Sequence, residues 1–261
     1  MQEKFKIKNR KGLEIVGIVS VMENPKGLAF TMHGLGGFKE QPHIQMLADV
    51  FYDANFTSVL FDTTNTFGES EGDYQNATVE QYYQDFEDVV SWAKSQSWYQ
   101  EPFFIAGHSL GGYSVVRFAE TYPELLKGVF AFAPFISGKM SIEACNRFMP
   151  EELSHWKKTG FIDKQSESKP GLIKRLPWSH MEERLKHDLL LNVSKITIPI
   201  LIVVGEKDTS IPPDHEKVLF DAISSSRKEM HIVGGAPHTF RKPEHLAELK
   251  DIFRKWLGKL K

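Results

Sequence analysis

The chain has 261 residues, 41% hydrophobic and 25% charged, a composition typical of a soluble globular protein and sufficient for one large domain. Its formal net charge of −2 gives no electrostatic reason to expect binding to nucleic acid or to an anionic membrane. A single cysteine, Cys145, excludes an internal disulfide, so the fold does not need an oxidising compartment.

Neither the first residues nor the apolar stretches predict targeting or membrane insertion. Residues 1–8 alternate charged and apolar side chains and contain no signal-peptide core. The longest apolar stretches, at 129–135 and 198–204, have the length of a strand and are far too short to cross a bilayer. We therefore expect a cytoplasmic protein without an integral membrane segment; a secreted or periplasmic form would need a leader.

The first half of the chain alternates strand-like apolar runs with amphipathic segments. We expect strands at residues 4–9, 14–21, 28–32, 56–61 and 103–106, and helices at 42–54, 78–93 and 110–120. The first two strands, joined at Lys11-Gly12, should form an antiparallel pair at a sheet edge. Thr78 is expected to start its helix, with Gln81 as the capping-box partner.

The second half continues this rhythm after one interruption. Strands are expected at 129–133, 200–204 and 229–233, and helices at 215–223 and 243–260. Strands that alternate with helices predict an α/β fold, a mostly parallel eight-stranded sheet with helices on both faces. Residues 137–194 break the pattern with prolines and many charges, and we interpret them as helical pieces inserted between two strands. The expected core is therefore 1–136 and 195–261.

The run PFFIAGHSLGG at residues 102–112 predicts a sharp turn from strand to helix around Ser109. An apolar strand stops at a Gly-x-Ser-x-Gly pattern and a helical segment follows. The small residues two before and two after the serine let this turn close. Ser109 would project from the strand end, above a helix N-terminus, which is typical of a nucleophilic serine.

Two further residues could complete a nucleophilic site. A serine hydroxyl needs a neutral imidazole to take its proton and an acid to orient that imidazole. Asp208 and His238 follow two successive strands, so the chain order is serine, acid, histidine. Alternatives remain open: His238 as a surface loop histidine, Asp208 as a turn residue or helix cap, and Glu206 or, less strongly, Asp214 as the acid.

The negative oxygen of a tetrahedral intermediate needs backbone N–H donors. One should be the amide of Leu110 at the helix start. The second should be Leu35, in the run HGLGG at 33–37, where glycines let the backbone approach a substrate; a plain glycine-rich turn is the alternative. We interpret His33 as shaping this loop and His108 as an elbow residue that points away from the nucleophile.

These motifs resemble those of the α/β-hydrolase superfamily over residues 14–257. The resemblance rests on HGLGG at 33–37, GHSLGG at 107–112, GEKD at 205–208 followed by Ile211-Pro212, and GAPHTF at 235–240. Within the superfamily the chain is similar to small bacterial carboxylesterases, including cinnamoyl and feruloyl esterases, and to monoacylglycerol lipases. The resemblance implies the α/β-hydrolase fold, oxyanion donors at Leu35 and Leu110, and a cap or lid formed by residues 137–194.

One loop departs from the family pattern. The family usually has Asp-x-x-Gly-x-Gly-x-Ser after its fourth strand, whereas this chain has DTTNTFGES at 62–70, which is one residue longer. Asn65 stands where a glycine is expected. Because asparagine tolerates a positive φ better than most residues, we expect the turn to survive. Asp62 and Ser70 are interpreted as structural.

The expected activity is that of a serine carboxylesterase that cleaves short- to medium-chain acyl or aryl esters through an acyl-enzyme on Ser109. No metal and no cofactor are expected, since the histidines show no His-x-x-x-His or His-Glu-x-x-His spacing. A thioesterase or acyltransferase using the same three residues is the alternative, followed by a non-catalytic binding scaffold.

The substrate contacts are harder to predict. Trp156, Phe161 and Trp178 in the inserted segment suggest an apolar acyl or aryl pocket, although they could equally form a small core of the insertion itself. Gly34 and His108 are further candidate substrate contacts. The expected partner is a small-molecule ester, with no nucleic acid, and the chain is expected to be a monomer or a homodimer.

Overall fold

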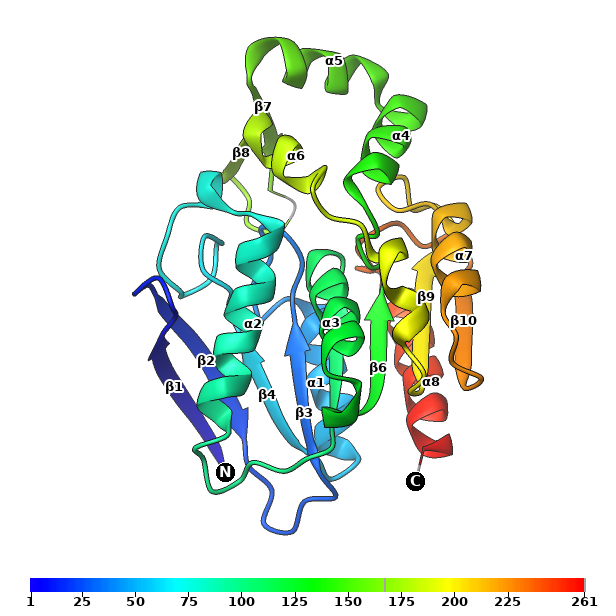
Figure 1. Cartoon of the computed structure of the whole chain (residues 1–261). Helices are drawn as coiled ribbons and strands as arrows, with labels where there is room; N and C mark the ends of the chain where they lie inside the picture. Colours follow the sequence, from blue (N-terminus) through cyan, green and yellow to red (C-terminus); the bar gives the residue numbers. More distant parts are fainter. Residues whose placement is uncertain (167, 261) are drawn as a thin grey trace.

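The computed structural model describes residues 1–166 and 168–260, and a central sheet organises them (Figure 1). The eight strands of this sheet are β1 (Gln2–Lys8), β2 (Glu14–Ser20), β3 (Leu28–Met32), β4 (Thr57–Phe61), β5 (Phe103–His108), β6 (Leu126–Phe132), β9 (Ile200–Gly205) and β10 (Lys228–Val233). They lie in the order β1-β2-β4-β3-β5-β6-β9-β10. The expected mostly parallel sheet of eight strands is confirmed.

Pairing within the sheet follows the expected pattern. β1 pairs antiparallel with β2 at the edge, and β2 pairs antiparallel with β4. The remaining neighbours, from β4 to β10, pair parallel. Every residue of β3, β4, β5 and β9 is buried, because a parallel sheet covered on both faces has no solvent-facing side. Parallel pairing brings the carboxyl ends of these strands to one edge.

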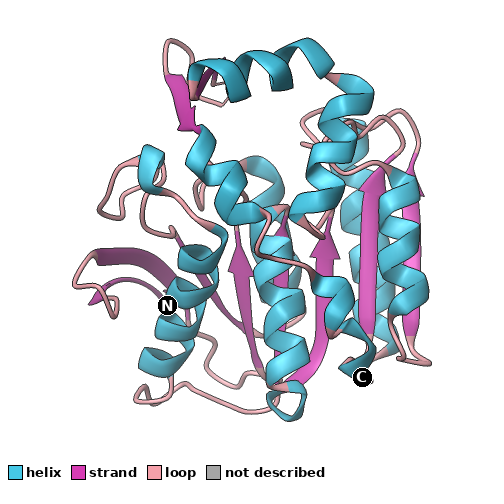
Figure 2. Cartoon of the chain, turned by 45° about the horizontal axis from the view of Figure 1, so that its top comes forward, coloured by secondary structure: helices cyan, strands magenta, loops and turns pink. Residues whose placement is uncertain are grey.

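Helices cover both faces of the sheet (Figures 1 and 2). On one face lie α2 (Val79–Ala93), α3 (Leu110–Thr121) and α7 (Pro213–Ala222); on the other lie α1 (Pro42–Asp53) and α8 (Pro243–Lys259). Each face has its own apolar cluster, and on the second Phe253 of α8 stacks on Phe130 of β6 with ring centroids 4.4 Å apart. No helix in the described ranges is both long and apolar enough to span a membrane.

The start of α2 shows a detail that differs from expectation. Thr78 Oγ1 accepts from the Gln81 amide at 3.0 Å, as an N-cap does. The Gln81 side chain does not return to Thr78; it donates instead to Asp85 at 2.6 Å. The amides of Val79 and Glu80 bind a carboxylate far along the chain, that of Glu183. The reciprocal capping box is therefore replaced by a contact with the inserted segment.

Residues 137–188, called the insertion below, lie above the carboxyl ends of the strands (Figure 2). Residues 189–194, which were expected to belong to it, pack instead on the sheet, with Leu189 and Val193 in the apolar cluster beneath α2 and α3. The insertion holds α4 (Gly138–Phe148), α5 (Pro150–Thr159), β7 (Phe161–Gln165), β8 (Ile173–Pro177) and α6 (Trp178–Arg184). The short turns of 3₁₀-helix η1 (Tyr74–Asn76), η2 (Pro123–Leu125), η3 (Leu189–Leu191) and η4 (Val193–Lys195) lie outside it. The expectation of helical pieces alone was incomplete, because β7 and β8 form an antiparallel hairpin.

The two ends of the insertion meet at one point. Ser137 and Asp188 form an isolated antiparallel bridge. Beside it the Leu189 amide donates to the Ile136 carbonyl at 3.0 Å, and the Gly138 amide donates to the His187 carbonyl at 3.2 Å. The chain therefore leaves the β6 end and returns to it next to where it left.

Candidate active site

Ser109 occupies the sharp turn between β5 and α3, with φ of 53° and ψ of −114°. This backbone conformation is strained for a residue other than glycine. It persists because the surrounding packing enforces it. A Cβ on Gly107 would lie 2.3 Å from the Gly111 carbonyl oxygen, and one on Gly111 would lie 2.5 Å from the His33 carbonyl oxygen. Glycine is therefore needed on both sides of the turn, as the sequence pattern predicts.

Ser109, His238 and Asp208 form a continuous chain of hydrogen bonds. Ser109 Oγ lies 3.0 Å from His238 Nε2, and His238 Nδ1 lies 2.7 Å from Asp208 Oδ2. The other carboxylate oxygen accepts from the amides of Ser210 and Ile211, each at 2.8 Å. With a carboxylate at Nδ1, the ring proton belongs on Nδ1, and Nε2 is free to accept the serine proton.

The two alternative acids are engaged elsewhere. Glu206 Oε2 accepts from the Gly235 amide at 2.7 Å, on the exposed side of the histidine loop. Asp214 pairs with Arg147 at 2.9 Å, and both side chains are exposed. Among the carboxylates weighed from the sequence, the buried Asp208 is the one that meets the imidazole.

The expected oxyanion donors lie on either side of Ser109. Leu110 is the first residue of α3, and Leu35 lines the same cavity as Ser109. Gly34 brings the second loop close, because a Cβ there would lie 2.9 Å from Ser109 Cβ. Within the described residues neither the Leu35 nor the Leu110 amide donates a hydrogen bond. Both donors are therefore available to a bound anion.

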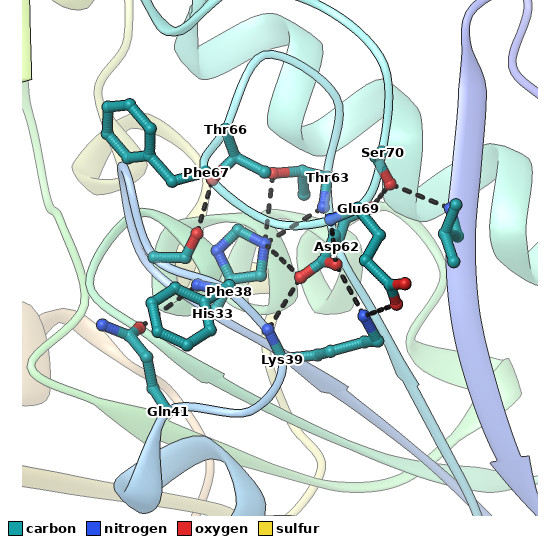
Figure 3. A network of polar contacts seen from close by, with 12 residues as sticks. His33, Phe38, Lys39, Gln41, Asp62, Thr63, Thr66, Phe67, Glu69 and Ser70 are labelled. Carbon is teal, nitrogen blue, oxygen red and sulfur yellow. Dashed lines mark hydrogen bonds and ion pairs between the residues drawn. The ribbon is translucent and has the colours of Figure 1, made fainter. Parts of the chain in front are cut away.

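His33 supports this loop from below (Figure 3). Its ring is fully buried, and burial lowers its pKa, so the imidazole is neutral. The Thr63 amide donates to His33 Nε2 at 3.0 Å, which leaves Nδ1 to donate to the Gly34 carbonyl at 2.8 Å. His33 thus fixes the Gly34 peptide beside Ser109, consistent with a loop-shaping residue.

Asp62 anchors the loop that departs from the family pattern (Figure 3). Its buried carboxylate accepts from the Lys39 amide at 2.7 Å, from Lys39 Nζ at 2.8 Å and from the Glu69 amide at 2.8 Å. Ser70 Oγ donates to the Asp62 carbonyl at 2.7 Å. A Cβ on Gly68 would lie 2.1 Å from the carboxylate carbon, so this ring of contacts requires glycine there. All these contacts are structural.

Asn65 adopts the conformation that the missing glycine would have taken. Its φ is 57°, and its amide donates to the Glu71 carbonyl at 3.0 Å. The side-chain oxygen accepts from the Asp73 amide, also at 3.0 Å. The turn therefore survives the substitution, because asparagine both tolerates the left-handed region and closes the loop with its own side chain.

A cavity of about 280 Å³ lies between the insertion and the strand ends and reaches Ser109 and His238. Its apolar walls come from both parts of the chain: Leu35, Tyr74, Phe135, Cys145, Met149, Leu153, Trp156, Ile162, Leu176, Met181 and Ile211. Trp156 therefore lines the cavity as expected. Trp178 packs edge-on against Trp156 at 5.4 Å, within the insertion's own small cluster.

Two of the expected substrate contacts lie elsewhere. Phe161 is 43% exposed, on the outer side of the hairpin beneath the Arg175 guanidinium. His108 is buried under His238, where its Nε2 donates to the His238 carbonyl at 3.0 Å. Burial lowers the pKa of His108 well below 6.5, so it is a neutral support for the base. It points away from the cavity, and Gly34 contributes space rather than a side chain.

Sequence patterns gave no signal for other groups at this site. Tyr74, Lys164, Lys174 and Arg184 also line the cavity. They come from a 3₁₀ turn and from the insertion. No sequence motif predicts how these segments fold. In the described ranges no group of three or more histidine, cysteine, aspartate or glutamate side chains could hold a metal.

The sequence of the chain is similar to those of known proteins. A family model named Hydrolase_4, described as serine aminopeptidase, matches residues 23–182. A thermostable monoacylglycerol lipase from Bacillus sp. (strain H-257) is 24% identical over 200 residues, 74% of this chain and 76% of that protein. An uncharacterized 31.7 kDa Escherichia coli protein is 24% identical over 254 residues, 85% of this chain and 88% of its own.

Solved structures resemble the whole chain. Est1E from Butyrivibrio proteoclasticus with bound ferulic acid has a TM-score of 0.79 and 19% identity, with 98% of each chain covered. Alpha/beta hydrolase domain-containing protein 10 from mouse has a TM-score of 0.78 and 17% identity, covering 99% of this chain and 100% of the other. At these identities the likeness concerns the fold.

Proposed function

The chain belongs to the Hydrolase_4 (serine aminopeptidase) family and has the α/β-hydrolase fold, and from this premise we propose that it hydrolyses carboxylic esters through an acyl-enzyme on Ser109. The observation that carries the proposal is the hydrogen-bonded chain from Ser109 through His238 to Asp208 at the floor of a cavity. The fold alone would not support this proposal, because proteins with this fold have many different activities.

The geometry supports a two-step mechanism. His238 Nε2 takes the proton of Ser109 as its oxygen attacks the acyl carbon, and Asp208 stabilises the imidazolium. The amides of Leu35 and Leu110 bind the oxyanion. His238 then returns the proton to the leaving alkoxide, and an acyl-enzyme remains. In the second step His238 deprotonates water, which attacks the acyl carbon; His238 then returns the proton to the leaving Ser109 oxygen, which frees the acid and Ser109.

An ester is the preferred substrate class because an alkoxide leaves more readily than an amine. The cavity volume of about 280 Å³ fits a small acyl or aryl group. The printed descriptions of a monoacylglycerol lipase and of a structure with ferulic acid support the same class. Thioester cleavage and acyl transfer need the same three residues, so substrate comparison must separate them.

Ser109→Ala tests the nucleophile. Hydrolysis of 4-nitrophenyl butyrate should fall by roughly 10⁶-fold in kcat, as when the serine of such a triad is removed. A fluorophosphonate probe should label Ser109 in the native chain and leave the variant unlabelled. Circular dichroism should be unchanged, because Ser109 contributes little buried area.

Ser141→Ala is the matched control, because Ser141 lines the same cavity from α4. It should keep both activity and labelling. Hydrolysis retained by folded Ser109→Ala would overturn the assignment. An acyl-length series of esters and matched thioesters then identifies the class, and rapid thioester cleavage with uniformly poor ester cleavage would assign the alternative.

A further inference from the structure

The cavity above Ser109 is lined by more positive than negative side chains. Of its described lining residues, Arg184, Lys164 and Lys174 are cationic, and Glu152 is acidic. Lys164 pairs with Glu152 at 2.5 Å, so these two charges offset each other. Lys174 donates to the Gly36 carbonyl at 3.1 Å. Arg184 forms no ion pair with any described residue, so an unopposed positive charge remains.

Arg184 is held in place at the end of α6. Its guanidinium lies over the Phe135 ring, 4.9 Å from the centroid, and its buried Nε has no hydrogen-bond partner among the described residues. The backbone is fixed by Gly138, where a Cβ would lie 2.4 Å from the Arg184 carbonyl. Removal from water lowers the pKa of Arg184, although a guanidinium stays charged at neutral pH.

The adjacent carboxylate acts on this charge from nearby but forms no ion pair with it in the described residues. Glu183 accepts from the amides of Val79 at 2.9 Å and Glu80 at 3.2 Å, and it lies 2.6 Å from His187 Nε2. These contacts turn Glu183 toward the start of α2 and away from the cavity. A cation withdrawn from water without a counter-charge is costly, and a bound anion would offset that cost.

Tyr74 supplies a second donor beside Arg184. Its ring lies against the oxyanion loop, since a Cβ on Gly36 would be 2.8 Å from Tyr74 Cε2. Burial raises the pKa of Tyr74, and the charge of Arg184 is near enough to oppose that rise. The phenol thus stays protonated and can donate to an acceptor in the cavity.

We propose that this cavity selects esters that carry a carboxylate, which the Arg184 guanidinium binds together with the Tyr74 hydroxyl. Guanidinium and carboxylate match as two parallel charge-assisted hydrogen bonds, and Arg184 lines the cavity. The inference rests on ester hydrolysis at Ser109. The carboxylate could belong to the acyl part, as in a monoester of a dicarboxylic acid, or to the alcohol part, as in an ester of a hydroxybenzoate.

Two substrate pairs separate these sources. Mono-4-nitrophenyl adipate is compared with 4-nitrophenyl hexanoate for the acyl part, and 4-acetoxybenzoate with its methyl ester for the alcohol part. The native enzyme should prefer the charged member of one pair in kcat/KM. Arg184→Gln should reduce that preference by about 10- to 100-fold, mainly through KM, because the contact exists in ground and transition states alike.

Arg175→Gln is the matched control, since Arg175 pairs with Asp163 on the exposed side of the hairpin and the variant changes net charge equally. It should leave the preference unchanged. Arg184→Lys should keep part of the preference, and Tyr74→Phe, which removes only the hydroxyl, should lower it a few-fold. If Arg184→Gln does not fold, the preferences for charged esters measured for Arg184→Lys and Tyr74→Phe test the proposal instead.

The outcomes separate the two proposals. Native enzyme that cleaves the neutral esters as well as or better than the charged ones overturns the carboxylate site and leaves ester hydrolysis standing. An unchanged preference in Arg184→Gln, or in both Arg184→Lys and Tyr74→Phe, also overturns it. Folded native enzyme that cleaves no member of either pair, with no fluorophosphonate label on Ser109, overturns the proposed function itself.

Discussion

The carboxylate of Asp208 is oriented by its own loop before it meets the histidine. Oδ1 accepts from two backbone amides of the same turn, which leaves Oδ2 directed at His238 Nδ1. Asp208→Asn replaces one of these oxygens with an NH₂ group, which accepts no hydrogen bond. Either the two backbone amides or His238 Nδ1–H then lose their acceptor. We expect the hydrolysis of 4-nitrophenyl butyrate to lose about 10⁴-fold in kcat, as when such an aspartate is replaced.

Glu206→Gln provides the comparison at a neighbouring carboxylate. Glutamine can still accept from the Gly235 amide, so kcat should change by about fivefold or less, which is the effect of weakening one hydrogen bond. Folding of both variants is checked by circular dichroism. The reverse ranking, with Glu206→Gln inactive and Asp208→Asn active, would assign Glu206 as the acid.

Residues whose conformation depends on the local backbone were predictable. Ser109 and Leu110 follow from a turn that only glycines permit, and Asn65 from the tolerance of asparagine for positive φ. The role proposed for Arg184 was not predictable, because it depends on the absence of an ion-pair partner among the described residues. That fact depends on Glu183 turning toward α2, a contact between segments about 100 residues apart.

At the scale of single elements, α7 carries an unusual group behind the acid. Glu216 is fully buried, and neither carboxyl oxygen has a hydrogen-bond partner among the described residues. Burial and the nearby charge of Asp208 raise the pKa of Glu216 well above 4.5. The folded state therefore keeps a proton that the unfolded chain releases near its ordinary pKa.

This difference between the folded and unfolded pKa of Glu216 determines whether its contribution to stability rises or falls with pH. A carboxyl whose folded pKa is raised binds more protons in the folded state, so its contribution to stability falls as pH rises above about 4.5. Glu216→Gln mimics the protonated form at every pH. We expect it to raise the midpoint of thermal unfolding at pH 8 more than at pH 5.

Calorimetry at the two pH values tests this, with Glu248→Gln at an exposed position of α8 as the control. The control should shift neither midpoint appreciably, since surface changes of this kind have small effects. An equal shift at both pH values, or destabilisation at pH 8, would show that Glu216 is ionised in the folded protein.

The elements of the sheet were easier to predict than those of the insertion. Buried parallel strands such as β3 and β9 are continuous apolar runs, and the predicted ranges agree with them within one residue. β7 and β8 read FIDKQ and IKRLP, with mostly exposed side chains. The hairpin is stabilised by the pairing of these two strands and by the packing of Ile162 and Leu176 inside the insertion. No short-range sequence pattern reveals these contacts.

At the scale of the whole molecule, the insertion meets the rest of the chain in two ways. Its ends are joined at the Ser137–Asp188 bridge. Its hairpin side reaches down to the loops around the site, where Lys169 donates to the Phe67 carbonyl at 2.5 Å. Gln41 donates to Ser168 at 3.0 Å on the same side. The cavity is thus roofed by a segment attached at opposite edges.

We propose that the insertion is a separable cap, and the bridge shows where to cut it. Bridged residues 137 and 188 can be joined by a two-residue Asn-Gly turn in place of residues 138–187, because such turns connect paired antiparallel residues. The shortened chain should fold and unfold cooperatively. Its melting temperature should fall by about 2–4 °C for each kcal/mol lost when apolar groups beneath the cap become exposed.

Activity separates the roles of core and cap in the shortened chain. Ser109, His238, Asp208 and the amides of Leu35 and Leu110 all lie outside the removed residues, so hydrolysis of 4-nitrophenyl acetate and fluorophosphonate labelling should persist. The preference for carboxylate-bearing esters should disappear, because Arg184 is removed with the cap while Tyr74 alone remains. Full-length Arg184→Gln is the matched control, since it lacks the charge but keeps the roof. A shortened chain that is soluble and cooperative yet inactive toward 4-nitrophenyl acetate would mean that the cap also orders the catalytic loops; an insoluble one would contradict its separability.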